Sequence, residues 1–162
     1  MIGLLRTSPA HERPDLLALP VYAAVTASPG DGLHVAEIDP EVADTAAFCE
    51  RYDVGLDVSA NCVVVAGRRG QDTRYAACVV LATTRADVNG VVRRRLDARK
   101  ASFAPMDLAV AETGMEYGGI TPFGLPPGWP VLVDQSVVDR EQSRHGFSSK
   151  IKRLFQPSHW MQ

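Results

Sequence analysis

Long apolar runs are missing from this sequence, and none approaches the roughly 20 residues that a transmembrane helix needs. Residues 16–25 (LLALPVYAAV) look like the core of a signal peptide, but Glu12 and Asp15 precede them and Pro20 interrupts them. A short amphipathic first helix is therefore the preferred interpretation. We expect a cytoplasmic protein without a membrane partner.

Cysteine and histidine are scarce. Cys49, Cys62 and Cys78 are odd in number, widely spaced and set among apolar residues, which favours reduced thiols in a core over a disulfide framework. The histidines show no metal-ligand spacing. They are His11, His34, His145 and His159. We expect neither a metal nor a cofactor.

A strong excess of one charge is also absent, because 17 Lys and Arg residues stand against 19 Asp and Glu residues. The chain as a whole is therefore not a generic nucleic-acid binder. The charge is uneven, however, since residues 85–100 hold 6 basic and 2 acidic residues and residues 101–139 hold 5 acidic and no basic ones. Residues 140–162 hold 5 basic residues and 1 acidic residue, so two basic segments flank an acidic one.

The length of 162 residues and the hydrophobic content of 46% suit one domain with one core. Asp39 followed by Pro40 predicts a helix over residues 40–52, with Asp39 as its cap. The β-branched runs 62–66 and 75–82, joined by a polar turn at 67–72, predict a hairpin. Its nearly continuous apolar runs indicate strands that are covered on both faces.

Further elements follow the hairpin. Thr84 can cap a helix whose apolar face carries Val88, Val91, Val92 and Leu96. A short helix over 105–113 and a strand over 131–133 come next, separated by residues 114–128, whose five glycines and three prolines fit no regular element. The expected order is α, β, α, β, β, α, α, loop and β.

The segment Gly118-Gly119-Ile120-Thr121-Pro122-Phe123-Gly124 is the most informative part of the sequence. Adjacent glycines let backbone N–H groups approach a ligand closely and bind an oxyanion or a carbonyl. The same glycines can instead do no more than build turns. Both interpretations remain open on these residues alone.

From Val58 to Asp134 the chain resembles the YbaK and prolyl-tRNA-synthetase-associated editing domain family. The shared features, in order, are a VVV strand after Asn61, Lys100-Ala101 followed by Ala104, Thr113-Gly114, the GGITPFG loop and a strand ending in Asp134. The resemblance implies an α/β (α+β) domain over residues 1–162, with a mixed or barrel-like sheet wrapped by helices. It also implies hydrolysis of the ester of mischarged aminoacyl-tRNA, which is proofreading in trans. The end of the chain departs from the family, and the weak amphipathic pattern of residues 147–155 predicts a frayed or partly helical tail over 140–162.

The loop carries most of the implied site. Gly118 and Gly119 would supply oxyanion donors, and the Thr121 hydroxyl would orient the water or the ester. An aminoacyl ester is already activated, so a positioned water and oxyanion stabilisation suffice and no catalytic triad is required. The remaining substrate-binding residues of the loop are Ile120, Pro122 and Gly124.

Three polar residues outside these glycines complete the site. Asp134 and Glu116 would pair with the α-ammonium of the aminoacyl group, and the alternative for each is a solvated or capping acid. Asn61 stands where family members usually carry a Lys, and a neutral amide holds a phosphate or a carbonyl less strongly than an ammonium does. Asn61 is thus either a catalytic residue or a simple β-bridge or turn residue.

A basic surface for the acceptor stem is expected at Arg93, Arg94, Arg95, Arg99 and Lys100, with a solvated helix face as the alternative. Aromatic and methionine side chains can form the walls of the amino-acid pocket or pack in the core. These are Phe103, Met106, Met115 and Tyr117.

The leading interpretation is a free-standing aminoacyl-tRNA deacylase with aminoacyl-tRNA as its partner. The alternative is a catalytically weak or inactive YbaK-fold module that binds tRNA or a synthetase, and hydrolysis of another small ester or amide is a third possibility. The sequence determines neither the amino acid that is removed nor the oligomeric state.

Overall fold

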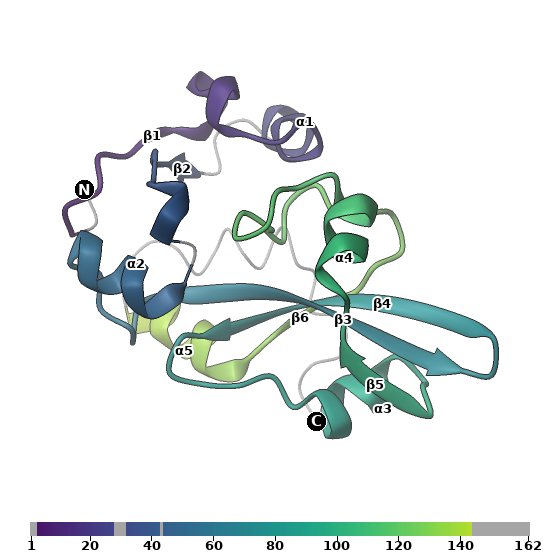
Figure 1. The fold of residues 1–162 in the computed structure, drawn as a ribbon. Helices are drawn as coiled ribbons and strands as arrows, with labels where there is room; N and C mark the ends of the chain where they lie inside the picture. Colours follow the sequence, from purple (N-terminus) through teal and green to yellow (C-terminus); the bar gives the residue numbers. More distant parts are fainter. Residues whose placement is uncertain (1–2, 28–31, 43, 144–162) are drawn as a thin grey trace.

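A mixed four-stranded sheet forms the centre of the structure, a computed structural model that describes residues 3–27, 32–42 and 44–143 (Figure 1). The strand order is β5-β3-β4-β6. β3 pairs antiparallel with β4 and β5, and β4 pairs parallel with β6. The strands are β3 (Ala60–Arg69), β4 (Asp72–Leu81), β5 (Lys100–Phe103) and β6 (Val131–Val133).

The predicted hairpin is confirmed, but its turn is shorter than residues 67–72. Pairing continues out to Arg69 and Asp72, so only Gly70 and Gln71 make the turn. Gly70 has a φ of 63°, which a residue without a Cβ adopts at little cost. Both faces of the hairpin are buried in its middle, as the continuous apolar runs indicated.

The predicted helix over 40–52 is divided in two, which corrects the position of its cap. Pro40–Val42 forms a 3-10 turn, and α2 runs over Thr45–Tyr52. Asp44 is the N-cap of α2, since its side chain accepts hydrogen bonds from the Ala46 and Ala47 amides. Asp39 instead accepts from the Glu41 amide within the preceding turn.

The helix expected after Thr84 also begins later than predicted. Asp87 caps it, and the Thr84 hydroxyl donates to the Leu81 carbonyl oxygen. The first part, η4 (Val88–Val92), is a π-helical turn, and the short α3 (Arg93–Arg95) follows it. The wider π turn leaves Val91 40% exposed, while Val88, Val92 and Leu96 pack in the core cluster beneath β3 and β4.

The helix α4 (Met106–Thr113) and the loop after it confirm the prediction for residues 105–128. The first helix, α1 (Leu19–Ala27), begins three residues later than the apolar run suggested. Short strands β1 (Ser8–Pro9) and β2 (His34–Val35) pair with each other, and α5 (Gln135–Ser143) follows β6. The sequence patterns did not predict β1, β5 or α5.

Figure 1 shows how these elements are layered. The N-terminal part with α1, β1 and β2 lies above the sheet in this view, the loop after α4 lies between the two, and α3 and α5 lie below. Across the described ranges no helix is both long and apolar enough to cross a bilayer. The basic tail that was predicted to fray lies outside the described residues from position 144 onward.

Candidate functional site

The strand register brings two of the expected site residues to one end of the sheet. Asn61 in β3 pairs with Val80 in β4, and Val133 in β6 pairs with Val79. Asp134 follows Val133 and its amide donates to the Val79 carbonyl oxygen, so Asn61 and Asp134 lie on either side of Val80. Neighbouring strands are about 4.8 Å apart, which separates the two backbones by roughly 10 Å.

Asn61 is held by Thr45, a residue that no sequence pattern indicated. The Thr45 hydroxyl, in the first turn of α2, donates to the Asn61 side-chain oxygen at 3.1 Å in a half-buried position. The Asn61 side chain therefore still has its amide hydrogens to donate. No local pattern could have revealed this contact, because the two residues are sixteen positions apart and meet only when α2 packs at the strand end.

Asp134 caps α5. One carboxylate oxygen accepts hydrogen bonds from the Ser136 amide at 2.9 Å and from the Ser136 hydroxyl. The capping role was the alternative weighed for this residue, and it occupies only Oδ1. Glu116 is exposed, and its backbone carbonyl rather than its carboxylate makes the local contact, by accepting from the Gly119 amide.

The glycine-rich loop packs against the N-terminal part of the chain. Met115 is 1% exposed and joins a cluster with Ala10, Val21 and Val25, which Ile120 and Phe123 contact from the loop. A side chain at Gly124 would meet the Pro20 carbonyl oxygen well inside contact distance. These contacts hold the loop against the N-terminal part of the chain, whereas the side chain of Asn61 is bonded to Thr45 of α2. Neither set of contacts joins the loop to Asn61, so a pocket between the two stays a prediction.

Hydrogen bonds inside the loop constrain its donors. The Gly119 N–H already donates to the Glu116 carbonyl oxygen at 3.0 Å, so it is not a free oxyanion donor in this conformation. The Thr121 hydroxyl donates to the Phe123 carbonyl oxygen at 3.2 Å. The Gly118 N–H finds no acceptor within the described part of the chain and is held with a φ of 79°.

The cysteines are free thiols, and those in the central hairpin are poor nucleophiles. Burial, with a smaller contribution from Cys78, raises the pKa of Cys62 to about 12. Burial also raises the pKa of Cys78 to about 11. Both therefore stay protonated near neutral pH, so Cys62 is not a nucleophile although it directly follows Asn61.

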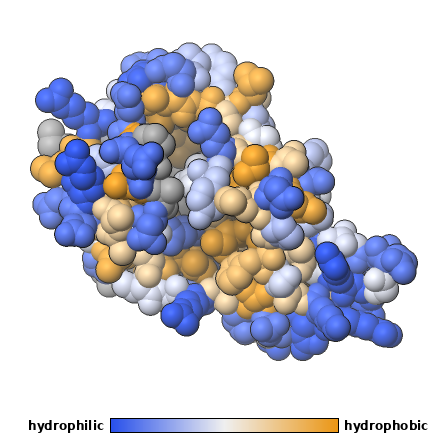
Figure 2. All heavy atoms as spheres, in the orientation of Figure 1, coloured by the Kyte–Doolittle hydropathy of each residue, from blue (hydrophilic) through white to orange (hydrophobic). Residues whose placement is uncertain are grey.

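The basic residues gather at the opposite end of β3 from Asn61. They do not lie on a single helix face, because they come from both a helix and a strand. Arg93 and Arg95 belong to α3, whereas Lys100 begins β5 and pairs directly with Arg68 of β3. Figure 2 shows hydrophilic residues gathered at the right-hand end of the molecule, where the hairpin of Figure 1 turns. Arg68 was missed because strand pairing alone joins it to the segment 93–100.

Acidic partners neutralise only part of this basic surface. Asp97 pairs with Arg69 at 2.6 Å and lies 3.8 Å from Arg74. The Arg93 side chain donates to the Asn89 carbonyl oxygen at 2.8 Å. Four exposed cations of this surface form no ion pair with any described residue. These are Arg68, Arg94, Arg99 and Lys100.

The suggested pocket walls divide into core and surface residues. Met115 belongs to the core, as already described. Phe103, Met106 and Tyr117 are instead 59%, 55% and 68% exposed. Over the described ranges no three His, Cys, Asp or Glu side chains come together in a way that could hold a metal ion.

The geometry has relatives among solved structures. A crystal structure of a candidate trans-editing enzyme for prolyl tRNA synthetase superposes with a TM-score of 0.61 at 19% identity, over 75% of this chain and 74% of that one. A crystal structure of a hypothetical protein gives 0.60 at 20% identity, over 75% and 77%. These values show a shared α+β fold, while no curated protein matches the chain.

The sequence itself identifies the family. Residues 39–147 match the family model of the aminoacyl-tRNA editing domain, which covers about two thirds of the chain. The matched region contains α2, the whole central sheet, the glycine-rich loop and Asp134. The chain therefore belongs to the aminoacyl-tRNA editing domain family.

Proposed function

We propose that this protein hydrolyses the ester bond of mischarged aminoacyl-tRNA in trans. The family match over residues 39–147 carries the proposal, because it spans Asn61, the glycine-rich loop and Asp134 together. Water attacks the ester carbonyl carbon, the bond to the ribose oxygen breaks, and the products are free tRNA and a free amino acid. Positioning and electrostatic stabilisation are enough for such an activated ester.

The described contacts support different tasks for the individual residues. The unpaired Gly118 N–H is the preferred oxyanion donor in the loop, since Gly119 is already bonded. The Asn61 amide, fixed in orientation by Thr45, donates to the ester or to the terminal phosphate. Asp134 retains one carboxylate oxygen beyond its capping bonds, and this oxygen can pair with the α-ammonium group.

The basic surface suits the acceptor end of tRNA. Like charges directly opposite each other in a sheet are destabilising, so the Arg68 and Lys100 pair is best compensated by an anionic ligand. Arg68 follows Asn61 by seven residues along β3, or roughly 23 Å at about 3.3 Å per residue. About seven nucleotide steps of roughly 3.4 Å span that distance. Because side chains an odd number of residues apart leave a strand on opposite faces, the tRNA has to pass from one face of β3 to the other to contact both places.

A deacylation assay with a panel of mischarged tRNAs tests the activity directly. Release of the amino acid above the uncatalysed rate supports the proposal, and no release from any member of the panel contradicts it. The panel also identifies the amino acid that is removed.

Binding is tested separately from catalysis. Neutralising Arg68 and Lys100 together, as Arg68→Gln with Lys100→Gln, should weaken tRNA binding and lower its salt slope by about 1 for each lost phosphate contact. Arg51→Gln is the matched control, because Arg51 is an exposed arginine on α2 away from the hairpin turn. An unchanged affinity and slope in the double variant would mean that the surface is only solvated.

A second candidate is a binding module without catalysis, and the identity of residue 61 favours it. The family usually carries a Lys there, and this chain has an asparagine whose oxygen is occupied by Thr45. On this view the chain binds tRNA or a synthetase without hydrolysing the ester. Retained tRNA binding with no deacylation would select this candidate.

A further inference from the structure

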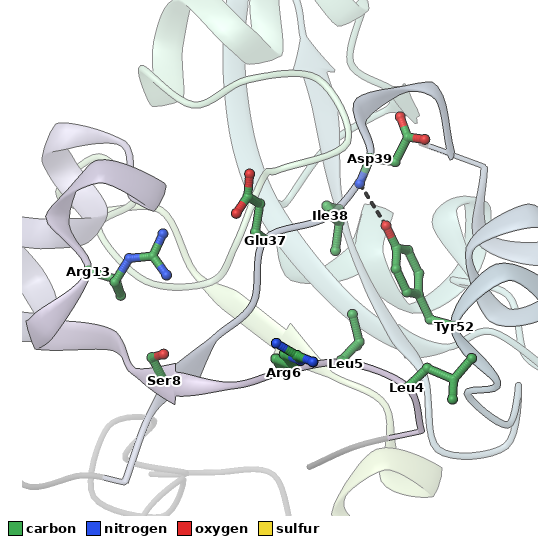
Figure 3. Close-up of a pocket in the computed structure, with 9 residues that line it drawn as sticks. All are labelled: Leu4, Leu5, Arg6, Ser8, Arg13, Glu37, Ile38, Asp39 and Tyr52. Carbon is green, nitrogen blue, oxygen red and sulfur yellow. Dashed lines mark hydrogen bonds between the residues drawn. The ribbon is translucent and has the colours of Figure 1, made fainter.

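A pocket opens in the N-terminal part of the chain, and no residue of the glycine-rich loop lines it (Figure 3). Its volume is about 740 Å³, within the range of ordinary small-molecule sites. The walls come from residues 4–13 and 37–39 together with Tyr52, and only Asp39 and Tyr52 of these lie within the family match over residues 39–147. Most of the lining therefore lies outside the part of the chain that identifies the editing family.

Tyr52 is what shapes the pocket. Strand pairing between β1 and β2 covers only Ser8 with Val35 and Pro9 with His34. The same register would place Arg6 opposite Glu37, but the two segments do not pair there. Tyr52 binds both segments instead, because its carbonyl oxygen accepts from the Leu4 amide at 2.8 Å and its hydroxyl accepts from the Asp39 amide at 2.7 Å.

Charges of opposite sign line the two walls. Arg6 and Arg13 come from the first segment and Glu37 and Asp39 from the second, and Figure 3 shows these side chains. Arg13 uses Nε and Nη2 on Asp15, which leaves Nη1 without a partner among the described residues. Glu37 adds a weaker attraction on the Arg13 guanidinium, whose ion pair is with Asp15.

Apolar surface and two hydroxyls, those of Ser8 and Tyr52, complete the lining. Leu4 is 68% exposed and Ile38 is 41% exposed, so both offer side-chain surface that the protein itself leaves uncovered. The Tyr52 hydroxyl accepts one hydrogen bond and still has its own proton to donate. The pocket thus offers cationic donors, a carboxylate acceptor and an apolar patch.

We propose that this pocket binds a small zwitterion with an apolar side chain, which is either a free amino acid or a short peptide. Its carboxylate would lie against Arg6 and Arg13, its ammonium group against Glu37, and its side chain on Leu4 and Ile38. A ligand with a single charge would leave the protein group of like sign unpaired beside it, which costs affinity. The inference does not rest on deacylase activity.

Isothermal titration calorimetry on the full chain tests the proposal. Leucine and leucyl-leucine are the zwitterions, and leucinamide and N-acetyl-leucine each lack one charge. At least one zwitterion should bind, and both single-charge analogues should bind at least about tenfold more weakly. Binding of leucine alone identifies a free amino acid as the ligand, and binding of leucyl-leucine alone identifies a peptide.

Variants locate the site. Glu37→Gln and Arg6→Gln should each weaken binding about tenfold, whereas Glu50→Gln, an exposed glutamate on α2, should leave it unchanged. Tyr52 and Thr45 lie at opposite ends of α2, about 10 Å apart at roughly 1.5 Å per residue. Asn61→Lys should therefore not affect zwitterion binding, which separates this inference from the proposed function. The proposal is wrong if no zwitterion binds at millimolar concentration, or if Glu37→Gln and Arg6→Gln bind as wild type does.

Discussion

Replacing Asn61 with Lys restores the charge that the editing family usually carries at this position, and it should raise deacylation of at least one mischarged tRNA. A hydrogen bond from a charged donor is worth about 1 kcal/mol more than one from a neutral donor. Expressed fully in the transition state, that difference is a factor of about five to ten in rate. We therefore expect kcat/KM to rise about five- to tenfold.

The same substitution should lower stability slightly. It removes the 3.1 Å hydrogen bond from Thr45, which costs about 1 kcal/mol in a half-buried position. For a chain of this size such a loss lowers Tm by about 2–4 °C. Attraction to Asp134 across Val80 offsets part of the loss, because at several ångströms and a partly solvated dielectric it contributes roughly 1 kcal/mol or less.

The assay compares wild type, Asn61→Lys and Asn61→Ala on one panel of mischarged tRNAs, with Tm measured for each. Asn61→Gln is the control for the added charge, since it keeps a neutral amide at the same position. If wild type is active and Asn61→Lys abolishes that activity in a folded protein, the site is built differently and the reasoning is wrong. Equal activity of wild type and Asn61→Lys would likewise remove residue 61 from the site.

Three further predictions follow from the described contacts. Gly119→Ala should leave Tm nearly unchanged, because the nearest atom to the new Cβ is 3.5 Å away. Gly124→Ala should lower the free energy of unfolding by about 1–3 kcal/mol, because the new Cβ collides with the Pro20 backbone. Similar Tm values for the two variants would contradict the packing described for the loop. Asp44→Ala removes the cap of α2 and should cost about 1 kcal/mol in a urea titration, with Glu50→Ala as the exposed control on the same helix. Burial raises the pKa of Cys62 to about 12, whereas in the unfolded chain the thiol ionises above its ordinary pKa of 9.0. Between these two values only the unfolded chain loses the proton, so the free energy of unfolding should be unaffected below pH 9 and should fall above it. The fall should reach about 1.4 kcal/mol per pH unit for each such thiol. Cys62→Ala should make that alkaline slope shallower, and an identical slope in the variant would refute the burial argument.

Elements with a strong local pattern were predicted correctly from the sequence. The hairpin follows from two β-branched runs around a glycine turn, and α4, the loop after it and β6 follow from helical spacing, glycine content and a short apolar run. The errors lie where two neighbouring residues could each cap the same helix. Asp44 rather than Asp39 caps α2, and Asp87 rather than Thr84 caps η4, because each neighbourhood offers two capping side chains and the packing of the helix selects one.

The sequence by itself determined the family and the set of residues that carry its motif, because both are read along the chain without knowledge of where the residues meet. Only the tertiary structure decided that Thr45 holds Asn61, that Arg68 pairs with Lys100, and that Tyr52 opens a pocket between residues 4–13 and 37–39. Each of these contacts joins residues far apart in the chain. Strand register and helix packing bring these residues together. Neither can be predicted from the spacing of residues within a single helix or strand.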